Sequence, residues 1–491
     1  MKRFGGLLLA AAVTLSACSK SYLDINTDPN NPTNASTDLV LSNALKTTAA
    51  PQVSTYAVFS EWMNYWAPSG SYAINSSDGA SYKQTTDFAD NNGLWTSAYR
   101  NLEDYDYVEK TATASNQYFY IAAAKTMKAY RFQQLVDMFN NVPYSEALAG
   151  TNKISPKYDN GKDIYEALST SLGDAVTMFQ RPDAIGSATQ DILFAGNKST
   201  WAKFANSLRL RLLMRQTEIS GRSAYIQSEI NKILANGAGF LTTDAGVNPG
   251  YANSSGQQNP FYGFAYSLTG GYTQDFWRAN KFIITFSQAH NDPRYTRWYA
   301  PIKDGSYVGN VVGSTTNAAG NLSSTFGPGV LKSVSQPAII FSAAESYFLQ
   351  AEAILRGFIA GSDLATFNSG VQASFTYLGA GSAAAYTSQA DKETNYSASS
   401  SFNEKLNTIM RQKYLAMQDV TPFEAWADYR RLSHLGLPFT ASIPVSQSPL
   451  RDGDAIPTRI LYPTSEYQTN LANVTAQGTI DHHSSKVFWM P

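Results

Sequence analysis

The sequence predicts a mainly α-helical protein, with a tetratricopeptide-like helical scaffold that carries long irregular loop elaborations. Apolar residues recur at three- and four-residue steps in several segments, which is the spacing of one face of an α-helix. These segments are rich in small and aromatic residues, as paired helices in tetratricopeptide arrays are. Between them lie long stretches rich in Gly, Asn and Ser that lack this periodicity. Loops of that length are uncommon inside a compact protein unless they carry function or are disordered.

Five segments carry the helical spacing. They are residues 118–139, 163–179, 201–212, 342–358 and 406–417. The second is the most regular, with apolar residues from Ile164 to Phe179 at helical steps. The fourth begins with Ser342 and Glu345, a spacing typical of a capping box, in which each side chain satisfies a backbone N–H at the helix start. We therefore expect paired helices, although the repeats are too degenerate to count.

The chain divides into a leader and one domain. Residues 1–17 are predicted to be a signal peptide, and residues 18–491 a single domain. The domain is expected to contain a helical scaffold at about 36–235 and 337–432, a loop-rich elaboration at about 240–336, and an irregular C-terminal segment at 433–491. The loop-rich elaboration has many aromatic residues and is expected to be ordered. Residues 360–401, rich in Ala, Ser and Gly, are expected to include a mobile insertion.

The amino terminus resembles that of a bacterial lipoprotein. Lys2 and Arg3 precede an apolar run ending at Leu15 that is too short to span a bilayer. The only cysteine, Cys18, follows two small residues, as in a lipobox. We predict that Cys18 is lipidated and anchors the protein, because several acyl chains hold stably where one is marginal. An ordinary secretory signal with an incidental cysteine is the alternative.

Composition argues against nucleic acid as a partner. The formal net charge of −1 leaves no basic field to attract phosphates. Hydrophobic residues make up 43% of the 491 positions, enough for a large core, while only 15% are charged. The 30 tyrosines, 25 phenylalanines and 8 tryptophans indicate an aromatic surface as well as an aromatic core.

Catalytic and cofactor motifs are not found. Phosphate-loop, dinucleotide-loop, metalloprotease and nucleophile-elbow patterns do not occur, so we expect no cofactor. A glycosidase needs two carboxylates beside the scissile bond, and Glu424 with Asp428 is a pair one helical turn apart. Such pairs are common on solvated helix faces, which is the interpretation we favour. We therefore expect a protein that is not an enzyme.

Metal binding is also not expected. His482 and His483 are adjacent in a polar segment and are predicted to be solvated. Asp24, Asn26, Asp28 and Asn30 alternate like the start of a calcium loop, but a proline takes the place of the glycine that makes its sharp turn.

Several motifs, in order along nearly the whole chain, resemble the SusD/RagB family of outer-membrane lipoproteins, in its SusD-like branch. The matching stretches are Tyr22-Leu23-Asp24, Asn141-Val142-Pro143-Tyr144, Trp201 to Arg211, Arg411-Gln412-Lys413-Tyr414, Glu424 to Arg431, Ile456 to Pro463 and Val487-Phe488-Trp489. The resemblance implies a tetratricopeptide-bearing fold on the cell surface. It also implies a SusC-like TonB-dependent transporter as partner, and an oligosaccharide or peptide as ligand.

Most residues of these motifs are expected to be structural. Partly buried Arg209, Arg211, Trp426 and Arg430 fit a role in locking helices and loops together. The segment Ile456–Pro463 is predicted to pack across the scaffold as an extended chain.

Ligand contacts are predicted on loops that combine flat aromatic rings with polar groups, because sugar rings have apolar faces and polar edges. The candidates are Tyr65, Trp66, Tyr72, Tyr82, Tyr272 and Trp277. Core packing is the competing explanation for tryptophans in these segments. The leading hypothesis is thus a nutrient-binding lipoprotein that serves a transporter. A surface glycoside hydrolase and a structural tetratricopeptide adaptor without ligand are the alternatives.

Overall fold

The computed structural model describes residues 35–52, 55–72 and 78–491. The predicted signal peptide, Cys18 and the Asp/Asn pattern at 24–30 lie outside these residues. In the described part the chain is mainly helical, which confirms the predicted fold class. None of its helices has the length and apolar character needed to span a membrane.

The first half of the scaffold is a series of helices that pack on their neighbours in the chain. They are α2 (Thr37–Ala49), α6 (Thr96–Ala114), α7 (Tyr118–Phe139), α8 (Gly161–Phe179), α9 (Lys198–Met214) and α10 (Ser223–Ala235). Helix α6 packs on α7, α7 on α8, and α8 on α9, as helices do in a tetratricopeptide array. In α8 the Asn160 side chain accepts the first free N–H, from Lys162, which explains why the helix starts there.

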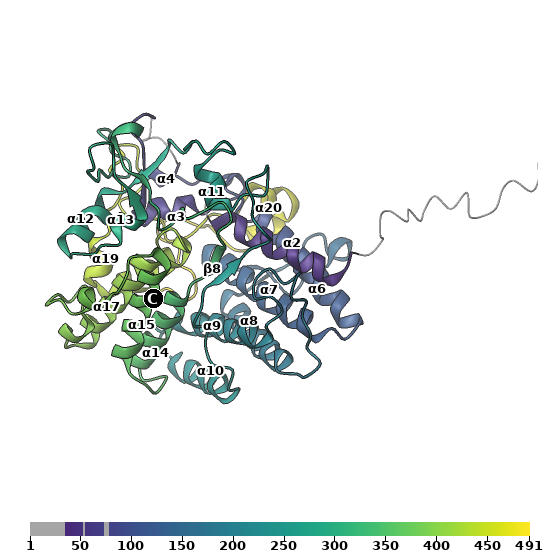
Figure 1. Ribbon diagram of the computed structural model, residues 1–491. Helices are drawn as coiled ribbons and strands as arrows, with labels where there is room; N and C mark the ends of the chain where they lie inside the picture. Colours follow the sequence, from purple (N-terminus) through teal and green to yellow (C-terminus); the bar gives the residue numbers. More distant parts are fainter. Residues whose placement is uncertain (1–34, 53–54, 73–77) are drawn as a thin grey trace, which may run out of the picture.

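The second half adds another layer of helices, drawn in green in Figure 1. They are α14 (Ala343–Leu355), α15 (Asp363–Leu378), α16 (Ala384–Thr387), α17 (Phe402–Met417) and α18 (Pro422–Leu432). Helix α14 contacts α9 as well as α15 and α17. It therefore joins the two halves of the scaffold.

Helix α15 occupies much of the segment that was expected to include a mobile insertion, and the sequence did not predict this helix. Phe367, Val371 and Phe375 are buried at four-residue spacing. The Ser362 side chain caps the helix start, and Gly379 ends it in the left-handed conformation with φ 66°. Abundant Ala, Ser and Gly around these positions lowered the apolar content and hid the helical face.

The capping box predicted at Ser342 is half formed. The Ser342 hydroxyl accepts from the backbone N–H of Glu345 at 3.1 Å, but the Glu345 carboxylate pairs with Arg211 at 2.7 Å. A complete capping box occurs at the start of α17, between Ser401 and Glu404. A buried guanidinium therefore outcompetes the local backbone donor for the Glu345 carboxylate.

Strands in the described residues form four short antiparallel pairs. These are β1 (Trp66–Pro68) with β5 (Trp277–Ala279), β2 (Val142–Pro143) with β3 (Tyr158–Asp159), β4 (Ala245–Val247) with β8 (Ala338–Phe341), and β6 (Tyr299–Ala300) with β7 (Thr325–Phe326). The β4–β8 pair joins the beginning and end of the loop-rich region. The β1–β5 pair fastens that region to the amino-terminal part of the chain.

Short helices complete the structure. The loop-rich region contains short helices that its sequence did not predict: α11 (Pro260–Ala265), α12 (Lys281–Ala289), α13 (Tyr295–Trp298) and η5 (Gly320–Leu322). Elsewhere lie α3 (Ala57–Trp62), α4 (Asp78–Ser81), α5 (Phe88–Asn91), α19 (Pro438–Ser442), α20 (Thr464–Thr469), α21 (Leu471–Thr475), η2 (Ala50–Gln52), η4 (Gly150–Asn152), η6 (Tyr396–Ala398) and η7 (Ser433–Leu435).

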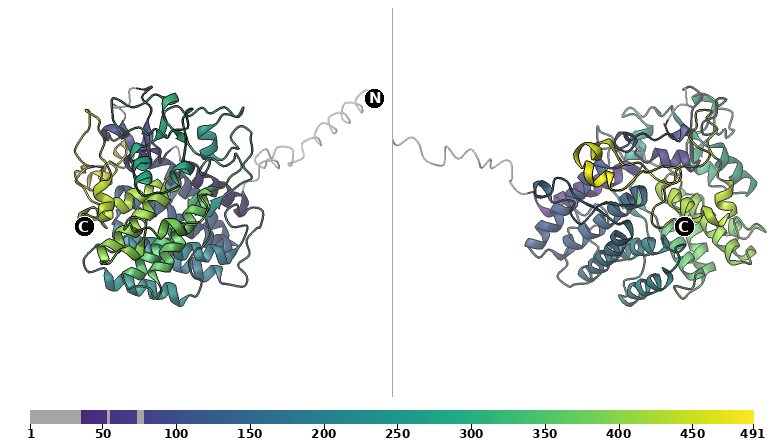
Figure 2. Two further views of the ribbon diagram at one scale, coloured as in Figure 1. Left: turned by 60° about the vertical axis from the view of Figure 1, so that its left-hand side comes forward. Right: turned by 180° about the vertical axis from the view of Figure 1, so that it is seen from behind.

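The C-terminal segment runs back over the scaffold and is seen in yellow in the right-hand view of Figure 2. The Ile460 N–H donates to the carbonyl of Met138 at 3.0 Å. The Trp426 indole donates to the carbonyl of Pro457 at 2.9 Å. These contacts confirm the structural role predicted for residues 456–463.

Candidate functional site

The two segments that supplied the ligand candidates meet in the fold. Strands β1 and β5 pair so that Pro68 lies opposite Trp277. The ladder continues beyond β1, because the Ser69 N–H donates to the carbonyl of Phe276 at 2.7 Å. Residues about 200 positions apart are thus brought to one surface, as binding by both segments requires.

Three of the six predicted residues are buried there and hold the fold together. Their side chains are at most 1% exposed. The Tyr65 hydroxyl donates to the carbonyl of Tyr414 at 2.5 Å, and the Trp66 indole donates to the Asp419 carboxylate at 2.5 Å. The third, Tyr82, accepts from a backbone N–H. Rings enclosed in this way have no face open to a ligand in this structure.

The other three predicted residues are at least partly exposed, although the hydroxyl of Tyr272 is itself buried. Tyr72 is 46% exposed, and Tyr272 and Trp277 are half-buried. Seven of the eight tryptophans are buried, and Trp277 is the exception. Trp277 is therefore the one tryptophan whose ring is partly accessible at the surface.

Further rings extend this surface. Phe276 lies between Tyr72 and Trp277, with centroid distances of 5.3 and 4.7 Å. Tyr266 contacts Tyr272 at 5.3 Å and stacks on Tyr262 at 4.8 Å. We call Tyr72, Tyr262, Tyr266, Tyr272, Phe276 and Trp277 the aromatic surface. Our sequence prediction omitted Tyr262, Tyr266 and Phe276, although a four-residue spacing of the two tyrosines signalled a shared face.

Polar groups lie among these rings. The Asp275 carboxylate has a side-chain exposure of 52% and accepts from Arg278. Arg278 also donates to the carbonyl of Gln274 at 2.6 Å, which holds the turn before β5. Gly320 lets the opposite loop approach, since a Cβ there would lie 1.9 Å from the Asp275 carboxylate. Flat rings beside a fixed carboxylate and amides are a suitable arrangement for sugar faces and hydroxyls.

A second hollow, which our sequence analysis did not predict, lies along α15. This α15 groove has a volume of about 880 Å³ and is lined mainly by hydroxyl and amide side chains, with Asp244, Lys332, Tyr347 and Tyr377 among them. The Lys332 ammonium lies 3.7 Å from the Tyr377 ring centroid. Tyr377 also borders a smaller hollow that reaches Pro260, at the start of α11.

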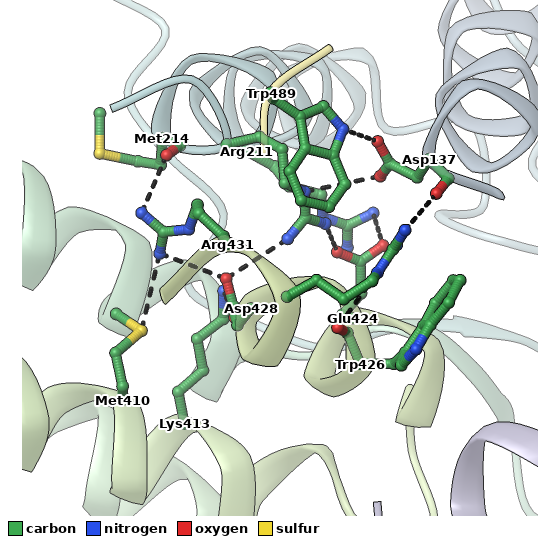
Figure 3. Close-up of polar contacts among 12 residues, drawn as sticks. Asp137, Arg211, Met214, Met410, Lys413, Glu424, Trp426, Asp428, Arg431 and Trp489 are labelled. Atoms are coloured by element: carbon green, nitrogen blue, oxygen red, sulfur yellow. Dashed lines mark hydrogen bonds and ion pairs between the residues drawn. The ribbon is translucent and has the colours of Figure 1, made fainter. Parts of the chain in front are cut away.

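The carboxylates considered for catalysis, Glu424 and Asp428, are not on a solvated face, so that interpretation is wrong. Both are at most 4% exposed. Figure 3 shows them within a network of buried ion pairs. Lys413 pairs with Asp428 at 2.7 Å, and Arg211 with Glu424 at 3.2 Å. No substrate reaches carboxylates that are enclosed in this way.

The network holds these carboxylates charged. Burial alone would raise the pKa of Glu424, but Arg211 and Arg215 outweigh it and lower the pKa below its usual value. Burial likewise opposes ionisation of Asp428, and Lys413 and Arg431 still lower its pKa. A catalytic acid would need the opposite shift. The network is therefore structural, as predicted for Arg211.

Arg209 and Arg430 also have structural partners. Arg209 pairs with Glu229, and both are buried. Arg430 lies 3.3 Å from the Trp426 ring centroid and donates to the carbonyl of Asp137 at 2.8 Å. The predicted locking role of these motif residues is confirmed.

The histidine pair differs from expectation. His482 is only 9% exposed, so the prediction that it is solvated is wrong. Its Nε2 lies 3.0 Å from the carbonyl oxygen of Tyr82. Burial and the neighbouring His483 lower its pKa.

Solved structures share this architecture across almost their whole length. A SusD homolog from Bacteroides fragilis has a TM-score of 0.75 and 21% identity, covering 93% of this chain and 99% of its own. A chitin-binding SusD homolog from Flavobacterium johnsoniae has a TM-score of 0.73 and 22% identity, covering 91% and 98%. A chitin-binding protein has a TM-score of 0.74 and 25% identity, covering 92% and 99%. No curated protein sequence matches the chain.

These similarities define the class of the fold, that of the helical SusD homologues. The family model described as "Starch-binding associating with outer membrane" matches residues 29–463. The chain therefore belongs to the SusD-like family of outer-membrane-associated proteins, as the motif order indicated.

Proposed function

We propose that the protein is an outer-membrane lipoprotein that captures oligosaccharides at the cell surface and delivers them to a SusC-like TonB-dependent transporter. The observation that carries the binding role is the aromatic surface, where Tyr72, Phe276 and Trp277 lie in ring contact beside the exposed Asp275 carboxylate. The family's description as starch-binding supports a glycan as ligand, as do the two similar proteins that bind chitin. Peptides are the alternative ligand.

The surface is open, which fits weak and reversible capture. Micromolar to millimolar dissociation constants correspond to binding free energies of about −8 to −4 kcal/mol. A ligand held in this range is released readily to a transporter, whereas tighter binding would slow its transfer.

The ligand test compares one single variant and one distant control variant with the wild type. Calorimetric titrations with maltooligosaccharides and chitooligosaccharides are carried out on the wild type, Trp277→Ala and Tyr467→Ala. Loss of one stacking ring should weaken binding about tenfold in Trp277→Ala. Tyr467 is similarly exposed, at 37%, but lies on α20, and its removal should leave affinity unchanged.

Other outcomes would show which part of the proposal is wrong: the site, the ligand class or the absence of catalysis. Equal affinity in wild type and Trp277→Ala, with a loss in Gln372→Ala, would move the ligand to the α15 groove, which Gln372 lines. If the protein binds peptides and no glycan, the ligand class is peptides and not oligosaccharides. Release of shorter sugars over hours would favour the hydrolase alternative.

The anchor and the transporter need separate tests. Cys18→Ala should release the protein from the membrane fraction if lipidation holds it there. Mild detergent extracts should contain a complex with a large outer-membrane barrel protein. A protein that is solitary in those extracts, yet still binds glycan, would leave the binding role intact and refute the partnership.

A further inference from the structure

Three potential metal ligands converge where two stretches of the C-terminal segment, around residues 452 and 482, approach each other. Asp452, His482 and His483 each offer one ligand atom, and these atoms all lie within 4.8 Å of one another. We call these three residues the His–Asp cluster. It lies apart from the aromatic surface and the α15 groove, since none of its residues lines either.

The backbone on both sides of the cluster is held in place. The Asp452 N–H donates to the carbonyl of Ser81 at 2.7 Å, and the His482 carbonyl accepts from the Thr458 N–H at 2.8 Å. The His483 N–H donates to the Asp481 carboxylate at 2.8 Å. The cluster is therefore positioned by hydrogen bonds that involve none of its own side chains, as a preorganised site requires.

His482 is suited to be a ligand. It is buried, and its Nε2 lies 3.0 Å from the Tyr82 carbonyl oxygen and 3.6 Å from the Asp452 carboxylate. Because Nε2 donates its N–H to this carbonyl, Nδ1 carries the lone pair that a metal would take, and metal-binding histidines are commonly oriented by such a bond.

His483 supplies the observation that points to a ligand. Both of its ring nitrogens are shielded from solvent, and neither has a hydrogen-bond partner in the part of the chain that the structure describes. Its ring centroid lies 4.2 Å from that of His482. A Cβ at Gly453 would lie 2.9 Å from the ring, so the glycine makes room for it. Buried nitrogens without a partner are costly unless something binds them.

We propose that Asp452, His482 and His483 bind a divalent transition-metal ion, with Zn²⁺ as the best fit. Two imidazoles and one carboxylate match the borderline character of zinc, and three protein ligands leave one position for water. Calcium and magnesium prefer sites built from oxygen ligands alone. The ion would tie the loop around Asp452 to the stretch that carries His482 and His483.

The test uses the full-length mature protein without a polyhistidine tag. Titration calorimetry with Zn²⁺ should show one ion per chain, and Co²⁺ should give the visible absorption bands of a ligated ion. Loss of a ligand in His483→Ala should weaken Zn²⁺ binding by about 100-fold or more. Asp452→Asn keeps the side-chain volume and should weaken it about tenfold, and Ca²⁺ should not compete.

The chain offers a matched control in its other two histidines. His290 and His434 each lie near a single carboxylate, at 2.5 and 3.4 Å. The double variant His290→Ala/His434→Ala should bind Zn²⁺ like the wild type. If His483→Ala and the wild type unfold at the same midpoint in the presence of a chelator, the substitution has left the fold intact.

Three results would overturn the proposal. One is no stoichiometric Zn²⁺ binding by the wild type. Another is equal binding by the wild type and a well-folded His483→Ala. If the double control variant loses as much affinity as His483→Ala, the ion binds elsewhere and the assignment is again refuted. Glycan binding is measured in parallel, and it does not depend on these outcomes.

Discussion

The buried ion-pair network and the aromatic surface both combine aromatic and charged side chains. The network is enclosed in the core, whereas the aromatic surface is accessible to solvent. Trp426 and Arg431 in the network are at most 1% exposed. Trp277 and its neighbour Asp275 are accessible to solvent. The motif residues Glu424 to Arg431, which helped to reveal the family, belong to the network. Motifs shared with a family can thus mark the fold, while the proposed ligand surface lies in loops between them.

Two aspartates nine positions apart show the contrast at the level of single charges. Asp428 lies between Lys413 and Arg431, at 2.7 and 3.2 Å, and its pKa is lowered although it is buried. Asp419 lies under the aromatic surface, where the Trp66 indole and a glutamine side chain are its hydrogen-bond donors. Burial without a cation raises the pKa of Asp419 to about 7. Cationic partners, and not burial alone, decide which carboxylate stays charged.

The largest effect is expected from breaking the network. Arg431 pairs with Glu352 at 2.6 Å and with Asp428 at 3.2 Å. Arg431→Leu leaves these buried carboxylates short of a partner and should lower the free energy of unfolding by about 3 to 5 kcal/mol. Urea denaturation measures this loss. A loss below about 1 kcal/mol would mean that the network is not the stabilising element we describe.

The next effect is a pH dependence that separates the two aspartates. Because the pKa of Asp419 is raised from 3.8 to about 7, the folded protein holds a proton that the unfolded chain releases. The free energy of unfolding should therefore fall as pH rises from about 4 to about 7. Asp419→Asn removes this titrating group. The fall in the free energy of unfolding between pH 4 and pH 7 should therefore be smaller in the variant than in the wild type by about 2 to 4 kcal/mol.

Another carboxylate titrates with the same sign. Burial raises the pKa of Glu61 to about 8, so wild type and variant share its contribution and the difference between them isolates Asp419. Parallel stability profiles for the two proteins from pH 4 to pH 8 would contradict the raised pKa.

A smaller effect is expected at the aromatic surface. Tyr72→Ala removes a ring that is 46% exposed and contacts Phe276. Glycan affinity should fall by about threefold to tenfold, or roughly 0.6 to 1.4 kcal/mol, with an unchanged melting temperature. A clear drop in melting temperature without loss of affinity would reverse the roles assigned to the two regions.

The smallest effect is expected for an ion pair outside the network. Lys162 pairs with Glu166 at 3.2 Å on α8, and their side chains are 46% and 36% exposed. Lys162→Met should change the free energy of unfolding by less than about 0.5 kcal/mol. Denaturation alongside Arg431→Leu compares a solvated pair with a buried one under the same conditions.

Local sequence patterns predicted the scaffold well where they were strong. The segment at 118–139 coincides with α7 (Tyr118–Phe139), and the segment at 163–179 lies within α8. Helix α12 (Lys281–Ala289), by contrast, lies in the region we expected to be made of loops. Its nine residues are too few for periodicity to stand out from the surrounding Gly, Asn and Ser.

Burial of the candidate rings depended on partners that are distant in sequence. Tyr65 and Trp66 are enclosed by contacts to residues 349 and 353 positions away. No local pattern contains such partners, so Tyr65 and Trp277 looked equivalent before the fold was known. The His–Asp cluster was missed for the same reason, since its aspartate and histidines lie on different segments.

The indole of Trp489 donates to the Asp137 carboxylate at 2.7 Å across a separation of 352 residues. As synthesis proceeds from the amino terminus, α7 emerges long before the side chain that completes its polar interior. In a ribosome-bound chain Gln133 and Tyr165 can already donate to this carboxylate, but the Trp489 indole joins them only when its segment has left the ribosome. The interior around α7 therefore reaches its final packing after the helices that enclose it have been synthesised.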